Sequence, residues 1–182
     1  MRRLRYSVAM SLDGYIAGPN GEADWIPTDP DIDFGEMFQQ FDTILVGRRT
    51  FEPMAAVGRA TVPGMRTIVC SRTLRQADYP GVTVLAERQV ETVAVMKMAE
   101  GKDIWLFGGG SLFRSLAEAA LVDTVEVSIV PILLGEGVKL VPGPADRIKL
   151  AFTSQKVYRS GIVSLQYEVK RHASTRYSLD LG

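Results

Sequence analysis

The stretch DIWLFGGGSLFRSLAEAA, residues 103–120, decides the fold class of this chain. Residues 103–107 are predicted to form a strand, the glycines at 108–110 a tight turn, and residues 111–120 a helix with Ser111 as its N-cap. Glycine lets a backbone approach a ligand closely, and a helix start offers free N–H groups and a positive dipole end to a pyrophosphate. We interpret the stretch as a strand–turn–helix unit that binds phosphate; a tight turn without a ligand is the alternative.

Two other predicted strands end in residues that suit an anion. The strand at 43–46 runs into the GRRT segment 47–50 at a predicted helix start, and the strand at 66–70 runs into Ser71 and Arg72. In an open α/β sheet, ligands collect at the carboxyl ends of the strands. The three strand ends are therefore predicted to converge on one extended, phosphate-bearing ligand.

Predicted strands and helices alternate along most of the chain. This alternation indicates one α/β domain over residues 2–170, with a central, mostly parallel sheet and an antiparallel C-terminal hairpin. The stretch 14–30 is rich in glycine and proline and is predicted to be a long ordered loop, whereas the tail 171–182 shows no pattern. The other predicted strands are 5–11, 82–85, 125–130, 148–158 and 162–170, and the other predicted helices are 31–40, 48–56 and 89–99.

The composition is that of an ordinary globular protein. The 182 residues contain 21 Lys and Arg against 21 Asp and Glu, so a net charge of zero gives no reason to expect a nucleic acid or an anionic membrane as partner. A single cysteine, Cys70, and a single histidine, His172, leave no zinc cluster, and Cys70 is expected to be a core thiol. We therefore expect no metal ion. No stretch approaches the roughly 18 apolar residues of a membrane helix, so we expect a cytoplasmic protein.

The zero net charge hides an asymmetry along the chain. Residues 13–42 contain eight acidic residues and no Lys or Arg, whereas residues 48–75 contain six arginines and one acid, Glu52. The charges form either two solvated faces or a site with an electropositive half for phosphates and an acidic half for a nitrogen-rich substrate. That all six cations are arginine favours the second interpretation, because a planar guanidinium binds phosphate through two parallel hydrogen bonds.

Five segments together resemble the dihydrofolate reductase superfamily, and more closely its bacterial branch related to the reductase domain of riboflavin biosynthesis. They are VAMSLDGYIAGPNGEADW (8–25), ILVGRRTFE (44–52), VCSRTL (69–74), IWLFGGGSLFRSL (104–116) and LVDTVEVSIVPILLGEGVKL (121–140). The resemblance implies a dihydrofolate reductase-like fold and an NADPH-dependent reductase for a small heterocyclic or imine substrate. The nearest activity it implies is that of 5-amino-6-(5-phosphoribosylamino)uracil reductase. Dihydrofolate or pterin reduction, or nucleotide binding without turnover, are the alternatives, and members of this branch often form homodimers.

The resemblance also assigns residues to the cofactor. The GRRT segment would meet the pyrophosphate and the 2′-phosphate region, the Ser-Arg pair the adenosine ribose phosphate, and the glycine turn the pyrophosphate. The first strand and the loop after it would flank the nicotinamide, and Asp13 would organise that turn rather than react. The implied NADPH-binding residues are Ala9, Ile16, Gly47, Arg48, Arg49, Thr50, Ser71, Arg72, Phe107, Gly108, Gly109, Gly110, Ser111 and Leu112.

On the substrate side, the resemblance offers one candidate for catalysis. Asp31 lies at the family's separation from Gly47 and would help to protonate the substrate ring. The alternative for Asp31 is an acid at a helix start that is favoured by the dipole. The residues expected to contact the substrate are Trp25, Asp33 and Phe34, with packing in the core as the alternative for Trp25 and Phe34.

Overall fold

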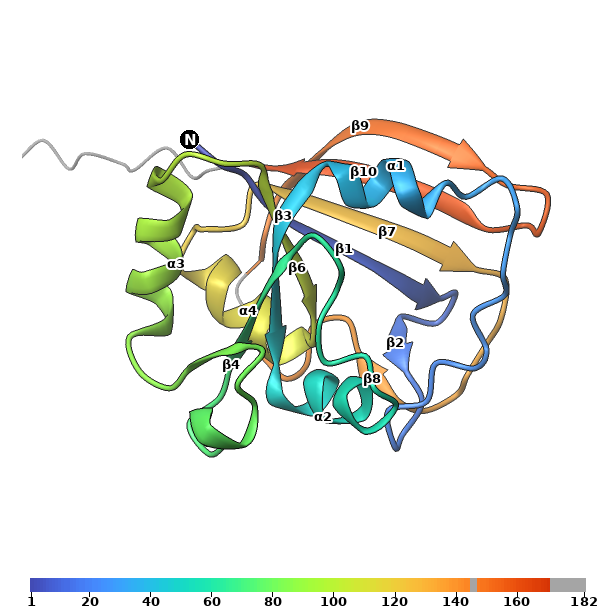
Figure 1. The fold of residues 1–182 in the computed structure, drawn as a ribbon. Helices are drawn as coiled ribbons and strands as arrows, with labels where there is room; N and C mark the ends of the chain where they lie inside the picture. Colours follow the sequence, from blue (N-terminus) through green and yellow to red (C-terminus); the bar gives the residue numbers. More distant parts are fainter. Residues whose placement is uncertain (145–146, 171–182) are drawn as a thin grey trace, which may run out of the picture.

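A central sheet organises the molecule (Figure 1). Within residues 1–144 and 147–170, which the computed structural model describes, eight strands form this sheet: β1 Leu4–Ser11, β3 Phe41–Gly47, β4 Arg66–Cys70, β5 Thr83–Leu85, β6 Asp103–Gly108, β7 Thr124–Val130, β9 Leu150–Val157 and β10 Val163–Val169. Their order is β5-β4-β3-β6-β1-β7-β10-β9. The strands from β5 to β7 run parallel, and β10 pairs antiparallel with both β7 and β9. The predicted α/β class and the C-terminal hairpin are confirmed.

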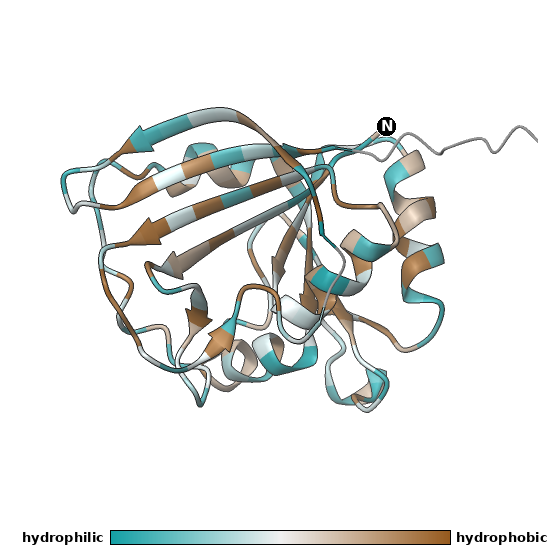
Figure 2. Cartoon of the chain, turned by 180° about the vertical axis from the view of Figure 1, so that it is seen from behind, coloured by the Kyte–Doolittle hydropathy of each residue, from teal (hydrophilic) through white to brown (hydrophobic). Residues whose placement is uncertain are grey.

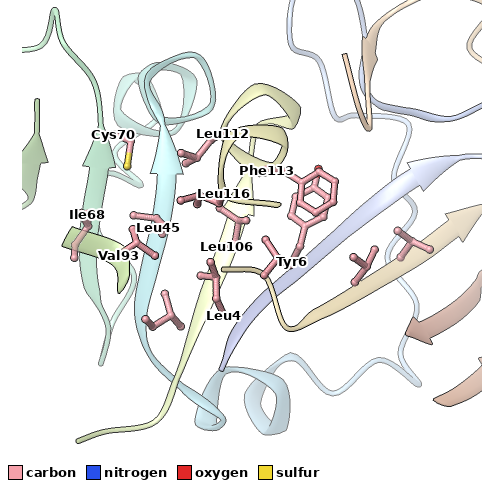
Figure 3. Packing of buried hydrophobic residues seen from close by; sticks show 14 residues of the cluster. Leu4, Tyr6, Leu45, Ile68, Cys70, Val93, Leu106, Leu112, Phe113 and Leu116 are labelled. Atoms are coloured by element: carbon pink, nitrogen blue, oxygen red, sulfur yellow. The ribbon is translucent and has the colours of Figure 1, made fainter. Parts of the chain in front are cut away.

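Helices cover both faces of the sheet. Their bounds are α1 Phe34–Gln39, α2 Arg48–Ala56, α3 Gln89–Met98 and α4 Gly110–Glu118, with a 3-10 turn, η1, at Gln76–Asp78. In β6, Leu106 packs towards α3 and α4 whereas Trp105 and Phe107 pack towards α1 and α2, because successive side chains of a strand point to opposite faces. Figure 3 shows the face that α3 and α4 cover. Here the ring of Phe113 from α4 stacks on Tyr6 from β1, with centroids 4.0 Å apart.

Most predicted elements occur at or near their predicted positions. The bounds of α2 and β4 agree with the prediction to the residue, because each is delimited by clear signals at both ends. The tail 171–182, and His172 within it, lie outside the described residues. In the part of the chain that the structure describes, no helix has the length and apolar character needed to cross a bilayer.

Two helices begin at other residues than predicted. α1 begins at Phe34 rather than at residue 31, because Asp33 is its N-cap and accepts a hydrogen bond from the Glu36 N–H at 2.8 Å. α4 begins at Gly110 with Gly109 as its N-cap, so the predicted capping role of Ser111 is wrong. The extended backbone of Gly109 takes the N-cap conformation and places Ser111 within the first turn.

Two segments that lie outside the predicted strands form a second, short sheet. β2 (Tyr15–Ala17) and β8 (Val138–Lys139) pair antiparallel. Their backbones approach so closely that a Cβ on Gly137 would collide with the carbonyl oxygen of Ala17. The prediction of a continuous loop over 14–30 is therefore wrong for β2, since its pairing partner lies far away in the sequence.

Candidate functional site

The carboxyl ends of β3, β4 and β6 lie side by side because these strands are neighbours in the sheet. Gly47 at the end of β3 is in register with Cys70 of β4. A Cβ on Gly47 would lie 3.6 Å from both the Gly108 oxygen and the Gly109 nitrogen of the glycine turn after β6. Across that turn, a Cβ on Gly109 would be 3.3 Å from the hydroxyl oxygen of Thr50. The predicted convergence of three strand ends is confirmed.

Two helices also begin at this edge, and neither is capped by a side chain. The N-cap residues of α2 and α4 are Gly47 and Gly109, which form no side-chain hydrogen bond to the first-turn N–H groups. Neither helix carries an acidic residue in its first turn. The free N–H groups and the positive dipole ends of both helices are therefore available to one anion.

Three arginines and a serine surround the two helix starts. Arg48 already forms an ion pair with Glu52 one turn along α2, with 2.9 Å between Nη1 and Oε2. Arg49 and Arg72 are exposed. Ser71 is buried, and its hydroxyl accepts hydrogen bonds from the backbone N–H groups of the turn that follows β4. Ser71 thus shapes the turn that presents Arg72.

A cleft of about 2680 Å³ extends from this edge across the sheet face that α1 and α2 flank. Every residue that the resemblance assigned to NADPH lines this cleft: Ala9, Ile16, Gly47, Arg48, Arg49, Thr50, Ser71, Arg72, Phe107, Gly108, Gly109, Gly110, Ser111 and Leu112. Of the residues expected near the substrate, Asp33 and Phe34 line the cleft. The structure therefore brings the candidate cofactor residues together on one continuous surface.

Asp31 has a different position from the one expected of a catalytic acid. It does not line the cleft, and its Oδ2 lies 2.9 Å from Nε of Arg159 in the turn between β9 and β10. Asp29 reinforces this attachment, since hydrogen bonds from the Ser160 side chain and backbone hold the pKa of Asp29 below its ordinary value. The helix-start alternative is wrong, because Asp33 takes that place. The catalytic role of Asp31 stays a prediction that this geometry does not favour.

Hydrogen bonds within and between loops hold the segment after β1. Asp13 accepts hydrogen bonds from the Ser11 hydroxyl at 2.6 Å and from the Gly135 N–H at 2.8 Å. The hydrogen bond from Ser11, followed by those from backbone N–H groups, lowers the pKa of Asp13, which organises the turn as expected. Trp25 donates its indole N–H to the Glu22 carbonyl at 3.1 Å and does not line the cleft, so its predicted substrate contact finds no support in this geometry.

An aromatic wall forms one side of the cleft. It consists of Phe34 and Phe38 from α1 with Trp105 and Phe107 from β6. Successive ring centroids lie 6.2, 5.5 and 4.9 Å apart. Phe34 is 48% exposed, which leaves part of its ring open to a ligand. The wall offers a flat ring a surface on which to stack.

Serine side chains that the sequence analysis missed line the same cleft. Ser7 lies on β1, Ser128 on β7 and Ser164 on β10, and the hydroxyls of Ser128 and Ser164 are 2.7 Å apart. Figure 2 shows hydrophilic and hydrophobic residues alternating along β7 and β10. The sequence signal that could have revealed these serines is the alternation in TVEVSIV and VSLQYEV, which indicates that each strand has one polar and one apolar face.

An ionic network closes the cleft near the start of β1. Arg5 bonds both carboxylate oxygens of Glu126, at 2.7 and 2.9 Å, and lies 3.5 Å from Asp103. Burial alone would lower the pKa of Arg5, but the hydrogen bond and charge of Glu126 and the charge of Asp103 raise it. Within the described residues, no three His, Cys, Asp or Glu side chains gather as a metal site requires.

A family model and a relative match most of this chain. The family model described as the RibD C-terminal domain matches residues 2–164. The chain is 35% identical over 178 residues to YyaP of Bacillus subtilis (strain 168), a protein described as uncharacterized, and the match covers 91% of this chain and 94% of YyaP.

Two solved structures share the fold. A putative riboflavin biosynthesis protein from Shewanella sp. PV-4 is similar with a TM-score of 0.79 and 24% identity, over 94% of this chain and all of that one. Dihydrofolate reductase from Enterococcus faecalis, in complex with NADP(H) and RAB-propyl, is similar with a TM-score of 0.68 and 23% identity, over 93% of this chain and 97% of that one. At these identities the two structures support the fold.

Proposed function

Because the chain belongs to the RibD C-terminal domain family, we propose that it is a reductase that transfers a hydride from NADPH to a small, flat heterocyclic or imine substrate. The nearest named activity is that of 5-amino-6-(5-phosphoribosylamino)uracil reductase. The observation that carries the proposal is the meeting of two glycine-capped helix starts with exposed arginines at adjacent strand ends. A dinucleotide with a third phosphate needs such a set of anion-binding groups.

The residues present fit this cofactor. The N–H groups of α2 and α4 would bind the pyrophosphate between them, where Gly47 and Gly109 leave room for it. Arg49 and Arg72 would bind the 2′-phosphate, because Arg48 is paired with Glu52. When bound, the cofactor supplies the hydride, and the protein contributes orientation and the exclusion of water.

The substrate half of the cleft suits a flat polar ring. Phe34 and the other rings of the aromatic wall would stack on such a ring, while Ala9 of β1 would flank the nicotinamide beside it. Asp33, at the start of α1, would place a carboxylate at the mouth of this half. The acidic stretch 13–42 thus supplies groups to the substrate side and the arginine-rich stretch 48–75 to the cofactor side.

A panel of substrates tests the proposal. NADPH oxidation would be followed with 5-amino-6-(5-phosphoribosylamino)uracil, dihydrofolate and a small cyclic imine, and NADPH binding would be measured separately by fluorescence. We expect NADPH binding and turnover of the pyrimidine. Turnover of dihydrofolate alone would select the pterin alternative, and binding without any turnover would identify a nucleotide-binding protein. Absence of NADPH binding would overturn the proposal.

A further inference from the structure

One row of side chains crosses the cleft face of the sheet from β1 to β9. The strand registers place Ala9 opposite Ser128, Ser128 opposite Ser164, and Ser164 opposite Lys156. All four line the cleft. Ala9 is the residue expected beside the nicotinamide, so Ser128 and Ser164 occupy the next two positions, where the reacting ring of a substrate would lie.

The two hydroxyls form a hydrogen-bonding unit with spare capacity. Their oxygens are 2.7 Å apart, so one hydroxyl donates to the other. Each serine hydroxyl has one donor proton and two acceptor lone pairs. After their mutual hydrogen bond, the pair retains one free proton and free lone pairs, and both residues are partly exposed towards the cleft. A donor and an acceptor side by side complement the C=O and N–H edge of a lactam.

Two charged side chains flank this serine pair, and both have partners. Lys156, at the end of the row, lies 4.6 Å from the centroid of the Tyr158 ring and donates a hydrogen bond to the Asp31 carbonyl oxygen at 3.4 Å. The next row on the same face contains Glu126, which is bound by Arg5 through both oxygens and is therefore neutralised. The indole N–H of Trp105 donates to the Ser7 carbonyl at 2.9 Å, which fixes the aromatic wall beside β1. A flat ring between this wall and the serine pair would meet an apolar face and a polar edge.

We propose that Ser128 and Ser164 together recognise the uncharged lactam edge of the substrate ring and thereby determine substrate specificity. This inference rests on the proposed function, because it places the ring beside the nicotinamide. It goes beyond that function by naming the two residues that would contact the ring, which therefore select rings that carry adjacent C=O and N–H groups. Imines without a lactam do not engage the pair.

The chain offers a matched control: a serine on the same face whose hydrogen bond joins two strands in the same way but which lies farther from Ala9. On the neighbouring strand β9, the Ser154 hydroxyl bonds Oε1 of Gln166 at 2.9 Å, one row away on the same face. We would compare Ser128→Ala, Ser164→Ala and Ser154→Ala, with Ser164→Thr as the variant that keeps the hydroxyl. The measurements are kcat and KM with 5-amino-6-(5-phosphoribosylamino)uracil and with a cyclic imine, NADPH affinity, and Tm.

We expect Ser128→Ala and Ser164→Ala to raise the KM for the pyrimidine about tenfold, the effect of losing one hydrogen bond to the ligand. Turnover of the imine, NADPH affinity and Tm should change no more than in Ser154→Ala, and Ser164→Thr should restore most of the affinity. If the two serine variants change KM no more than Ser154→Ala does, the inference is overturned.

A binding experiment separates this inference from the proposed function. The affinity of 5,6-diaminouracil for the protein saturated with NADP⁺ would be measured by calorimetry, which needs no turnover. Binding that weakens in Ser164→Ala but not in Ser154→Ala supports the serine pair even if no substrate is reduced. Binding that is equal in both variants overturns the pair even if the reductase activity is established.

Discussion

The arginines at the cofactor end of the cleft differ in what they can offer a phosphate. Arg48 is half-exposed and paired with Glu52 within α2. Arg49 and Arg72 are exposed, line the cleft and form no ion pair among residues 1–144 and 147–170. The two that are not engaged are therefore the better candidates for selecting NADPH over NADH, which differs only in lacking the 2′-phosphate.

Arg72→Ala is expected to weaken NADPH binding about tenfold and to leave NADH binding nearly unchanged. A charge-assisted hydrogen bond contributes about 1.5 kcal/mol at the lower end of its range, which suits an exposed residue, and about 1.4 kcal/mol is a tenfold change. Titrations of both cofactors at fixed ionic strength would measure this. Arg75→Ala is the control, since Arg75 is paired with Asp78 and does not line the cleft. Equal losses for both cofactors would place Arg72 on the pyrophosphate instead.

Asp33→Asn is expected to lower kcat/KM more than Asp31→Asn does. Asparagine is as good an N-cap as aspartate, so this change removes the charge from the cleft while keeping the start of α1. Asp31→Asn loses an exposed ion pair with Arg159, which is worth less than about 1 kcal/mol. Steady-state kinetics with NADPH affinity as a reference would decide. A large loss in Asp31→Asn alone would restore Asp31 as the catalytic acid.

At the scale of elements, the start of α4 is packed against β8. A Cβ on Gly110 would lie 2.6 Å from the Lys139 oxygen and 2.7 Å from the Leu140 oxygen. Both contacts are backbone atoms, which cannot turn away as a side chain could. Gly110 is therefore required by packing, whereas Gly109 lines the cleft, and a Cβ added there would have within 4 Å only the Thr50 hydroxyl, which belongs to a side chain that can turn away.

Gly110→Ala is expected to destabilise the fold by about 1–3 kcal/mol, the usual cost of overpacking. Gly109→Ala should retain the stability, because its Cβ would meet only the Thr50 hydroxyl oxygen at 3.3 Å. It should lower NADPH affinity, because the added Cβ would lie where the turn approaches the pyrophosphate. Urea unfolding and NADPH titration of both variants would separate the two effects. Destabilisation of similar size in both would show that the whole turn serves packing alone.

Asp13→Ala is expected to free the loop after β1 from the 134–135 segment. The pKa of Asp13 is lowered from 3.8, chiefly by the Ser11 hydroxyl, so the carboxylate accepts these hydrogen bonds at neutral pH. The resulting stabilisation is present above about pH 4 and is lost as the pH falls through the lowered value. Hydrogen exchange at Gly135 would detect faster opening in the variant at pH 7. Unchanged exchange would show that β2 and β8 hold the loop without Asp13.

Local signals made some elements predictable and left others hidden. The bounds of α2 follow from Gly47 before it and from the end of its apolar periodicity, and both signals lie within a few residues. The β2–β8 pair joins segments far apart in the sequence, and with three and two residues neither strand is long enough to be recognised alone. The N-cap at Asp33 was hidden among neighbouring acids, each of which could have capped the helix.

At the scale of the whole molecule, buried ion pairs join the central strands near their amino ends. Arg5 and Glu126 are 9% and 12% exposed and connect β1 to β7. Lys97 of α3 reaches Asp123 at 2.5 Å just before β7. The pairs lie at the end of the sheet opposite to the glycine turns, away from the proposed cofactor-binding groups.

Glu126→Gln is expected to destabilise the protein by about 3 kcal/mol, because it leaves the buried Arg5 charge without its main partner. Asp78→Asn, which removes the exposed pair with Arg75, should cost less than about 1 kcal/mol. Chemical denaturation at pH 7 would compare them. Equal costs would show that Asp103 alone compensates Arg5.

The convergence of the cofactor turns could be predicted, whereas the serine pair could not. The three turns follow parallel strands, and the topology of an open sheet brings such ends together whatever the loops between them. Ser128 and Ser164 meet only because β10 returns antiparallel beside β7 in one particular register. Register depends on the complete sheet, so the alternation in each strand indicated a polar face without showing which hydroxyls would touch.

The buried thiol of Cys70 can be used to follow unfolding of the protein. Burial raises the pKa of Cys70 to about 12, so at pH 7 the side chain is the thiol rather than the reactive thiolate. It is the single cysteine of the chain, and it lies in β4 within the largest core cluster. Cys70 borders the cleft but is only 7% exposed, so opening of that core is expected to speed its modification by an alkylating reagent. A cysteine introduced on the surface could likewise carry a dye while Cys70 stays in place and silent.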